Sequence, residues 1–222
     1  MSDRLATILA AARAHADDII APNIDAWNDA KTWPRDASNK AGEAGLTGLY
    51  APPELGGQGL PLSEGIQVYE QLGLGDGAYA FALSMHNICT FAGCGYGTDA
   101  FKEKWARDLT SGRKLANFAL TEPQSGSDPM QMYTRATING DSTWTISGAK
   151  AWVSLAGEAD IYFTVVKTSD APGHKDMAMI AIPANARGLT FGPMYDTPSY
   201  NFLPMSEMYL DNVVISEDNI IL

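Results

Sequence analysis

The sequence is short of basic residues, of cysteine and of histidine, and each shortage argues against a class of function. Lys and Arg total 15 against 26 Asp and Glu, and the net charge of −11 disfavours nucleic-acid binding because phosphate repels it. Two cysteines, Cys89 and Cys94, cannot form a disulfide framework, and with His86 they lack a fourth ligand and a standard zinc spacing. We expect buried thiols, no metal site, and surface positions for His15 and His174.

Long apolar runs are also missing. No run approaches the roughly 20 residues that span a bilayer, and charges at Asp3, Arg4 and Arg13 interrupt the region where a signal peptide would be apolar. These features predict a cytoplasmic protein without membrane insertion. The chain has 222 residues, 45% hydrophobic and 18% charged, which suits a packed globular protein of one or two modest domains.

Helical signals fill the chain up to about residue 113. Apolar residues recur with a helical period near the N-terminus, and Thr98 can cap the last helix of this half. The segment 78–94 is hydrophobic on all sides, which predicts a fully buried helix. A Pro- and Gly-rich loop is expected over 47–64. The predicted helices cover residues 3–20, 34–44, 63–72, 78–94 and 98–112.

After about residue 115 the pattern changes to short segments rich in Val, Ile, Thr, Tyr and Phe, separated by turn residues. Several short strands at this spacing are typical of an antiparallel sandwich or barrel. Helices followed by strands predict an α+β chain, with a helical N-terminal domain over 1–113 and an antiparallel β-barrel or sandwich domain over 114–222. Strands are predicted near 117–120, 143–146, 151–154, 161–166, 177–182 and 208–215, with turns at 139–141, 147–148, 172–173 and 187–188.

The segment 118–128, FALTEPQSGSD, leaves a predicted strand and enters a loop dense in hydroxyl groups. Such a loop can offer backbone N–H groups and hydroxyl donors to the edge of a heteroaromatic ring or to a phosphate. Taken alone, it is better explained as a turn that satisfies its own backbone.

A second informative segment is 148–154, GAKAWVS. Trp152 and Ser154 are two residues apart, so in a regular strand they share a face. An indole beside a hydroxyl on one face can support a flat cofactor, whereas a core Trp with a solvent-facing Ser is the plainer alternative. The two segments together favour a planar ligand with polar edges.

The same two segments resemble signatures of the acyl-CoA dehydrogenase family. LTEPQSGSD is similar to the family's Thr-Glu-Pro and Gly-Ser-Asp signature, and ISGAKAWVSLAGEAD is similar to its next block at a matching spacing. In the helical half, EAGLTGLYAPPELGGQGL resembles the family's loop after its second helix. The resemblance covers essentially the whole chain. It implies a helical domain followed by a β-barrel domain that binds FAD and oxidises a CoA thioester between its α and β carbons.

The resemblance also implies roles for individual residues. Leu120, through its backbone, and Thr121, through its hydroxyl, would meet the pyrimidine edge of the flavin. Trp152 would flank the ring system, and Ser154 would donate toward flavin N5, where charge builds up on reduction. Ser127 would lie near the flavin pyrophosphate and the thioester arm of the substrate. The implied FAD-binding set is Phe118, Leu120, Thr121, Gly126, Ser127, Trp152 and Ser154.

Acyl-CoA is the substrate that the resemblance implies. Phe81, Ser84 and Met85 match the helix that lines the acyl pocket in relatives, and Ser127 joins them as a substrate-binding residue. A bulky Phe81 would shorten the pocket or favour a ring-shaped acyl group.

The sequence departs from the family pattern in two places. Relatives usually carry a C-terminal four-helix bundle that holds the catalytic glutamate, and the chain stops where that bundle would begin, so we assign no general base within it and give Glu122 no such role. In TPSYNFLPMSEMYLDNVVIS, Leu203, Pro204 and Ser216 occupy a region where relatives tend to carry a basic residue, a serine and a later proline. Contacts to CoA or between subunits are expected to differ there.

Three functions stay open at this point. An FAD-dependent acyl-CoA dehydrogenase is the leading interpretation, with an electron-transfer flavoprotein as the acceptor. A flavin-dependent monooxygenase or oxidase on the same fold, or a non-catalytic subunit of a heteromeric dehydrogenase, is the alternative. A flavin site without its bundle would leave apolar surface exposed, which predicts a homo- or hetero-oligomer.

Overall fold

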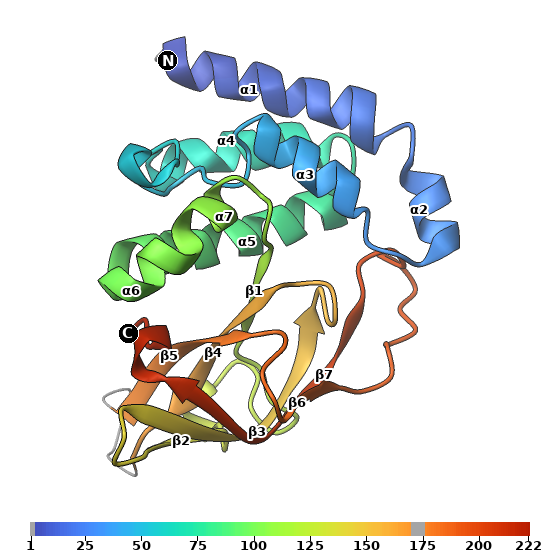
Figure 1. The fold of residues 1–222 in the computed structure, drawn as a ribbon. Coiled ribbons are helices and arrows are strands. Elements are labelled where there is room, and N and C mark those ends of the chain that lie inside the picture. The colour runs from blue at the N-terminus through green and yellow to red at the C-terminus, as the bar shows by residue number, and fades with distance from the viewer. Residues whose placement is uncertain (1–2, 170–175) are drawn as a thin grey trace.

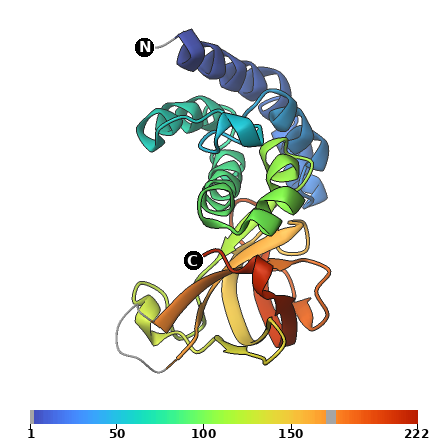
Figure 2. The same ribbon diagram turned by 60° about the vertical axis from the view of Figure 1, so that its left-hand side comes forward.

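The computed structural model describes residues 3–169 and 176–222, and helices and strands occupy separate ends of the molecule. Figures 1 and 2 show the helices gathered at one end and a curled sheet at the other, which confirms the predicted α+β order. His174 and the predicted turn at 172–173 lie outside the described residues. The helices are α1 (Asp3–His15), continued by the π-helical segment η1 (Ala16–Ile20), α2 (Ile24–Ala30), α3 (Arg35–Glu43), α4 (Leu62–Gly73), α5 (Gly77–Tyr96), α6 (Asp99–Phe101), continued by the π-helical segment η3 (Lys102–Ala106), and α7 (Arg107–Thr110).

Helix α5 differs from the expectation that it is buried on all sides. Phe81 and Ile88 lie two turns apart, and therefore on one face, and they are 42% and 43% exposed. The opposite side packs into the core through Tyr79, Leu83 and other residues. The prediction of a fully buried helix was therefore wrong, because a segment that is apolar on all sides does not indicate which face is exposed.

Two side chains cap helices as their residue types favour. The Asp76 carboxylate accepts a hydrogen bond of 2.9 Å from the Tyr79 N–H at the start of α5. The Thr98 hydroxyl accepts one of 3.1 Å from Phe101, which confirms the predicted cap. The same hydroxyl donates to the Asp218 carbonyl at 2.9 Å, so it also ties the C-terminal segment to α6.

The sheet is mixed, and the expectation of a purely antiparallel barrel or sandwich was wrong in this respect. Strand β1 pairs in parallel with β4, and β2 meets β4 in parallel at one residue pair, whereas the other pairings are antiparallel. Residue composition predicts where strands lie, but it does not predict whether two strands joined by a long connection pair in parallel or antiparallel. The strand order is β1-β4-β2-β3-β7-β6, with β5 paired to β4. The strands are β1 (Ala116–Ala119), β2 (Arg135–Ile138), β3 (Thr143–Ser154), β4 (Ile161–Lys167), β5 (Met177–Pro183), β6 (Leu189–Phe191) and β7 (Met205–Ser216).

One hydrophobic core runs through both halves of the chain. The Trp33 ring stacks on Tyr79 from α5, with centroids 5.4 Å apart, and on Phe202 from the segment before β7, with centroids 5.9 Å apart. Burial of these large rings supplies much of the energy that holds helices against sheet. The boundary between residues 113 and 114 stays a prediction, and it falls between the end of α7 and the start of β1.

Histidine and cysteine positions differ partly from expectation. Cys89 and Cys94 are buried, as predicted, and His86 is buried too. His15 is buried as well, so its expected surface position was wrong, because its ring lies 3.0 Å from the Tyr79 hydroxyl inside the core. Among the described residues, no group of three His, Cys, Asp or Glu side chains is arranged to hold a metal ion, and none of the helices is long and apolar enough to cross a bilayer.

Candidate functional site

The segment that follows β1 is attached to β3 along its backbone. The Ala151 N–H donates to the Thr121 carbonyl at 2.8 Å, and the Lys150 ammonium donates to the Leu120 carbonyl at 3.1 Å. The structure therefore brings Leu120 and Thr121 next to Trp152 in β3, although 30 residues separate Leu120 from Lys150. The two signature segments of the sequence form one surface.

Beneath this surface lies a buried ion pair that sequence analysis missed. The Lys150 Nζ lies 2.8 Å from the Glu122 Oε1, and the two side chains are 0% and 2% exposed. The Glu122 carboxylate also accepts hydrogen bonds from the backbone N–H groups of Tyr133 and Thr134. The sequence did contain one indication of this pair, a lysine in the apolar strand segment Ala149–Lys150–Ala151. A charged side chain that is buried in the protein needs a partner of opposite charge.

The ion pair fixes the protonation of both partners. Burial alone raises the pKa of the Glu122 carboxyl, but hydrogen bonds from Lys150 and from residues 133 and 134 outweigh it and hold that pKa below its usual value. Burial lowers the pKa of the Lys150 ammonium, and the partnership with Glu122 offsets this only in part. Glu122 is therefore a buried, paired carboxylate and not a free base.

The Gly-Ser part of the loop is open to solvent. Gly126 and Ser127 are exposed, after a tight turn in which the backbones of Glu122 and Ser125 exchange two hydrogen bonds of 2.9 and 3.0 Å. The Ser125 hydroxyl donates to the Asp128 carbonyl at 2.8 Å, which closes the turn on itself. The self-satisfied turn expected from composition is thus present over 122–128, and the hydroxyl of Ser127 has no partner among the described residues.

Trp152 lies at a β-bulge and is 60% exposed. The register with β7 shifts between Lys150 and Val153, and Trp152 has a φ of 58°, a left-handed conformation that is uncommon for a bulky residue. The argument that Trp152 and Ser154 share a strand face does not hold, because the bulge leaves Trp152 exposed while Ser154 is only 5% exposed. Strained backbone of this kind clusters at functional sites.

A second aromatic ring flanks Trp152. The Tyr195 ring centroid lies 4.5 Å from that of Trp152, with the planes 52° apart. Tyr195 also lines a hollow of about 300 Å³ together with Leu203 and Pro204, two of the residues that depart from the family pattern. Ser216, the third, lies apart, where its hydroxyl caps a short 3-10 helix at Asp218.

The other predicted residues lie on different elements. Phe118 on β1 is partly buried and packs against a hydrophobic cluster that includes Cys89 and Ala92 of α5, so it is engaged in the core. Phe81, Ser84 and Met85 lie on the partly open face of α5, and the Ser84 hydroxyl donates to the Phe81 carbonyl at 2.7 Å. In the described part of the chain, hydrogen bonds join Leu120 and Thr121 to β3, and none joins them to this α5 set.

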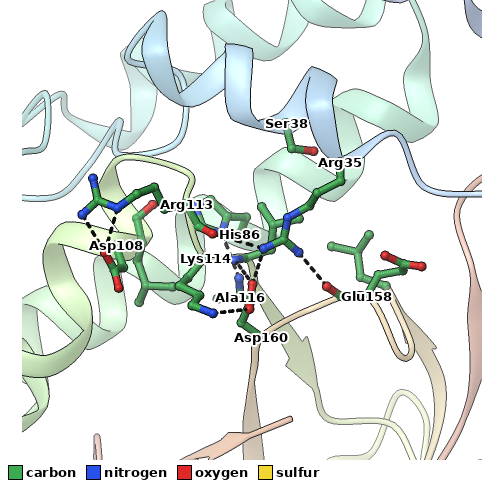
Figure 3. Close-up of polar contacts among 12 residues, drawn as sticks. Arg35, Ser38, His86, Asp108, Arg113, Lys114, Ala116, Glu158 and Asp160 are labelled. Carbon is green, nitrogen blue, oxygen red and sulfur yellow. Dashed lines mark hydrogen bonds and ion pairs between the residues drawn. The ribbon is translucent and has the colours of Figure 1, made fainter. Parts of the chain in front are cut away.

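A polar cluster fixes the point where β1 begins (Figure 3). Asp160 pairs with Arg35 from α3 and with Lys114 at 2.9 Å, and it accepts the Leu115 N–H at 2.8 Å. Burial alone raises the pKa of the Asp160 carboxyl, and these donors outweigh it and lower that pKa. Arg35 also donates to the Glu158 carbonyl at 2.8 Å, so one side chain links α3 to the loop before β4.

His86 on α5 also contacts the start of β1, and we call His86 together with this polar cluster the junction. Its Nδ1 accepts the Ala116 N–H at 3.0 Å, while its Nε2 lies 3.0 Å from the Leu109 carbonyl and 3.1 Å from that of Thr47. An acceptor at Nδ1 and carbonyls at Nε2 require a neutral ring with the proton on Nε2. Burial lowers the pKa of His86 to about 4, which agrees with this geometry.

Comparisons with known proteins give a consistent result. The family model "Acyl-CoA dehydrogenase, N-terminal domain" matches residues 2–113, and "Acyl-CoA dehydrogenase, middle domain" matches residues 117–213. Mitochondrial isobutyryl-CoA dehydrogenase of Dictyostelium discoideum is 30% identical over 93% of this chain and 49% of its own length. The chain spans about half the length of the curated relatives it matches.

Solved structures give the same result. Butyryl-CoA dehydrogenase from Megasphaera elsdenii superposes with a TM-score of 0.91 at 27% identity, over 99% of this chain and 58% of that chain. Glutaryl-CoA dehydrogenase from Mycobacterium smegmatis in complex with FADH2 superposes with a TM-score of 0.89 at 26% identity, over 100% of this chain and 56% of that one.

Proposed function

This chain belongs to the acyl-CoA dehydrogenase family, and from that premise we propose that it supplies the FAD-binding surface and the acyl-pocket helix for α,β-dehydrogenation of an acyl-CoA thioester. One observation carries the proposal. An exposed indole, at Trp152, lies beside Leu120 and Thr121, whose carbonyls accept hydrogen bonds from β3, while the Thr121 N–H has no partner among the described residues.

The donors of this surface fit the edge of a flavin. The Thr121 N–H and hydroxyl and the Ser154 hydroxyl have no hydrogen-bond partner within the described residues. A flavin ring presents carbonyl oxygens and ring nitrogens along one edge, which accept hydrogen bonds from such groups, and it presents a flat face that an indole can cover. The residues present therefore suit FAD.

In the proposed arrangement, Leu120 and Thr121 hold the pyrimidine edge, and Trp152 covers one face of the ring. Ser154 donates to the N5 region, where negative charge develops on reduction, and a donor fixed in a poorly solvated position stabilises that charge. Bound FAD would accept the hydrogen that leaves the β-carbon of the thioester. Ser127 is exposed in the loop, and we propose that it meets the pyrophosphate or the CoA arm.

The acyl group is proposed to lie along α5, over Phe81, Ser84 and Met85. Phe81 is 42% exposed, so its ring is available to limit the depth of such a pocket. Glu122 does not supply the base for the α-proton, since its carboxylate is buried and paired with Lys150. We propose that an electron-transfer flavoprotein accepts the electrons and that the protein works as an oligomer.

The test is the visible spectrum of the gently purified protein, with all accompanying chains weighed. We expect flavin absorbance that bleaches when an acyl-CoA is added without oxygen, and that returns with an electron-transfer flavoprotein more quickly than with oxygen. Rapid reoxidation by oxygen would replace this proposal with an oxidase or monooxygenase. A protein free of flavin that takes none up from solution would replace it with a non-catalytic subunit.

A further inference from the structure

Lys150 is the most deeply buried charged side chain near the proposed flavin edge, at 0% exposed. Its ammonium touches two groups of the 120–122 segment, the Leu120 carbonyl at 3.1 Å and the Glu122 carboxylate at 2.8 Å. A buried ion pair is on average no more stabilising than apolar residues of the same volume, because removing both charges from water is costly. Stability alone does not account for this pair.

The pair determines which way the neighbouring peptide units face. In a trans peptide unit the C=O and N–H point in opposite directions, and the described chain contains no cis peptide bond. Lys150 holds the Leu120 carbonyl inward, so the Thr121 N–H of the same peptide unit points away from the ion pair. The next carbonyl, that of Thr121, is held inward by the Ala151 N–H at 2.8 Å.

Glu122 anchors this arrangement from the other side. Its carboxylate holds Lys150 and, at the same time, the Thr134 N–H at 3.0 Å and the Tyr133 N–H. Gly148 lets β3 approach there, since a Cβ on it would lie 2.6 Å from the Thr134 Cα. The end of β1, the start of β2 and the middle of β3 therefore meet at one carboxylate.

We propose that the Glu122–Lys150 ion pair is a positioning device for the cofactor edge: it turns the peptide unit between Leu120 and Thr121 so that the Thr121 N–H faces the flavin. This inference rests on the proposed function. Lys150 acts through the backbone and is a positioning residue, because its ammonium is buried and donates to Leu120 and Glu122.

The test separates positioning from stability with three variants of the full chain. Lys150→Met leaves a buried carboxylate without its cation and is expected to lower both the melting temperature and the affinity for FAD, the latter about tenfold, or about 1.4 kcal/mol. Glu122→Gln/Lys150→Met removes both charges and is expected to recover much of the melting temperature. Its FAD affinity stays low, because the Leu120 carbonyl still has no donor.

Val213→Ala is the matched control. Val213 is buried on β7 and pairs with Ile146, four residues along β3 from Lys150, so its truncation destabilises the same sheet away from the flavin edge. It is expected to lower the melting temperature and leave FAD affinity unchanged. Amide exchange gives a second reading without cofactor: the Ala151, Tyr133 and Thr134 amides should exchange faster in both Lys150 variants than in Val213→Ala.

The outcomes distinguish the two proposals. If the wild-type chain binds FAD and the double variant regains wild-type FAD affinity along with its melting temperature, the pair is a stabilising feature only and the positioning role is refuted. Unchanged exchange of the three amides in Lys150→Met would refute it as well. If the wild-type chain does not bind FAD while those amides respond as described, the proposed function fails, and the positioning role toward a cofactor fails with it.

Discussion

Mild acid should loosen the contact between the helices and the sheet, because His86 must stay neutral to make its three contacts there (Figure 3). A second proton would go on Nδ1, which accepts the Ala116 N–H and would then face another donor. The charged groups nearby are Arg35, which disfavours protonation, and Asp160, which favours it, and burial is the largest effect. The folded protein therefore resists a proton that the unfolded chain takes up readily.

The size of the effect follows from the two pKa values. The pKa is about 6.5 in the unfolded chain and about 4 in the fold, so the unfolded state binds more protons between these values. The contribution of neutral His86 to the free energy of unfolding is present above pH 6.5 and is lost as the pH falls toward 4. The linkage relation gives a loss of about 2 kcal/mol near pH 5 and roughly 3.4 kcal/mol once both states are protonated.

Urea denaturation at pH 8 and pH 5 measures this loss directly. His86→Gln keeps a donor and an acceptor but does not titrate, so its free energy of unfolding should fall by about 2 kcal/mol less than that of the wild type over this interval. His15→Gln tests the second buried histidine in the same way, because burial also lowers the pKa of His15 to about 4, with Tyr79 as its partner. If His86→Gln shows the full wild-type loss, the neutral, buried state assigned to His86 is wrong.

Four further predictions follow from the same contacts. Gly148→Ala should lower the free energy of unfolding by about 1–3 kcal/mol, measured in urea, because its Cβ would overlap Thr134 and its φ is 151°. Arg35→Met should lower it by about 1–3 kcal/mol by removing one of the two cationic partners of Asp160, whereas no change would show that the Arg35–Asp160 pair contributes nothing. Trp152→Leu should weaken FAD binding roughly three- to tenfold in a fluorescence titration and leave the melting temperature nearly unchanged. Phe81→Ala should shift kcat/KM toward longer acyl-CoA chains, and an unchanged chain-length profile would remove Phe81 from the pocket.

Much of the fold could be predicted from local sequence signals. Thr98 as a cap, the Pro- and Gly-rich loop over 47–64, and the β-branched segments depend on neighbours in sequence, and they appear in the structure. The predicted turn at 147–148 was wrong, because β3 runs from Thr143 to Ser154 and joins two predicted strands. Helix α2 was missed because none of its seven residues is buried, so no apolar period marks it. Strands β2 and β6 were missed because they have only four and three residues.

The residues assigned to the site stay predictions, and their arrangement in space could not be predicted from the sequence. The two signature segments were recognised separately, and their contact depends on the Ala151–Thr121 hydrogen bond, which joins residues 30 apart. The bulge at Trp152 is the reason that Trp152 and Ser154 do not share a strand face as predicted. Residue types do not clearly indicate where a bulge occurs. The Glu122–Lys150 pair was missed because each charge, taken alone, suits a solvent-facing position.

A titration of the full chain with FAD, followed by the change in flavin fluorescence, tests the proposed flavin site most directly. We expect saturable binding of one FAD per chain, weakened by Trp152→Leu and by Lys150→Met but not by Val213→Ala. FAD affinity that is unchanged in Trp152→Leu and in Lys150→Met, or no FAD binding by the wild type, would contradict the proposed site.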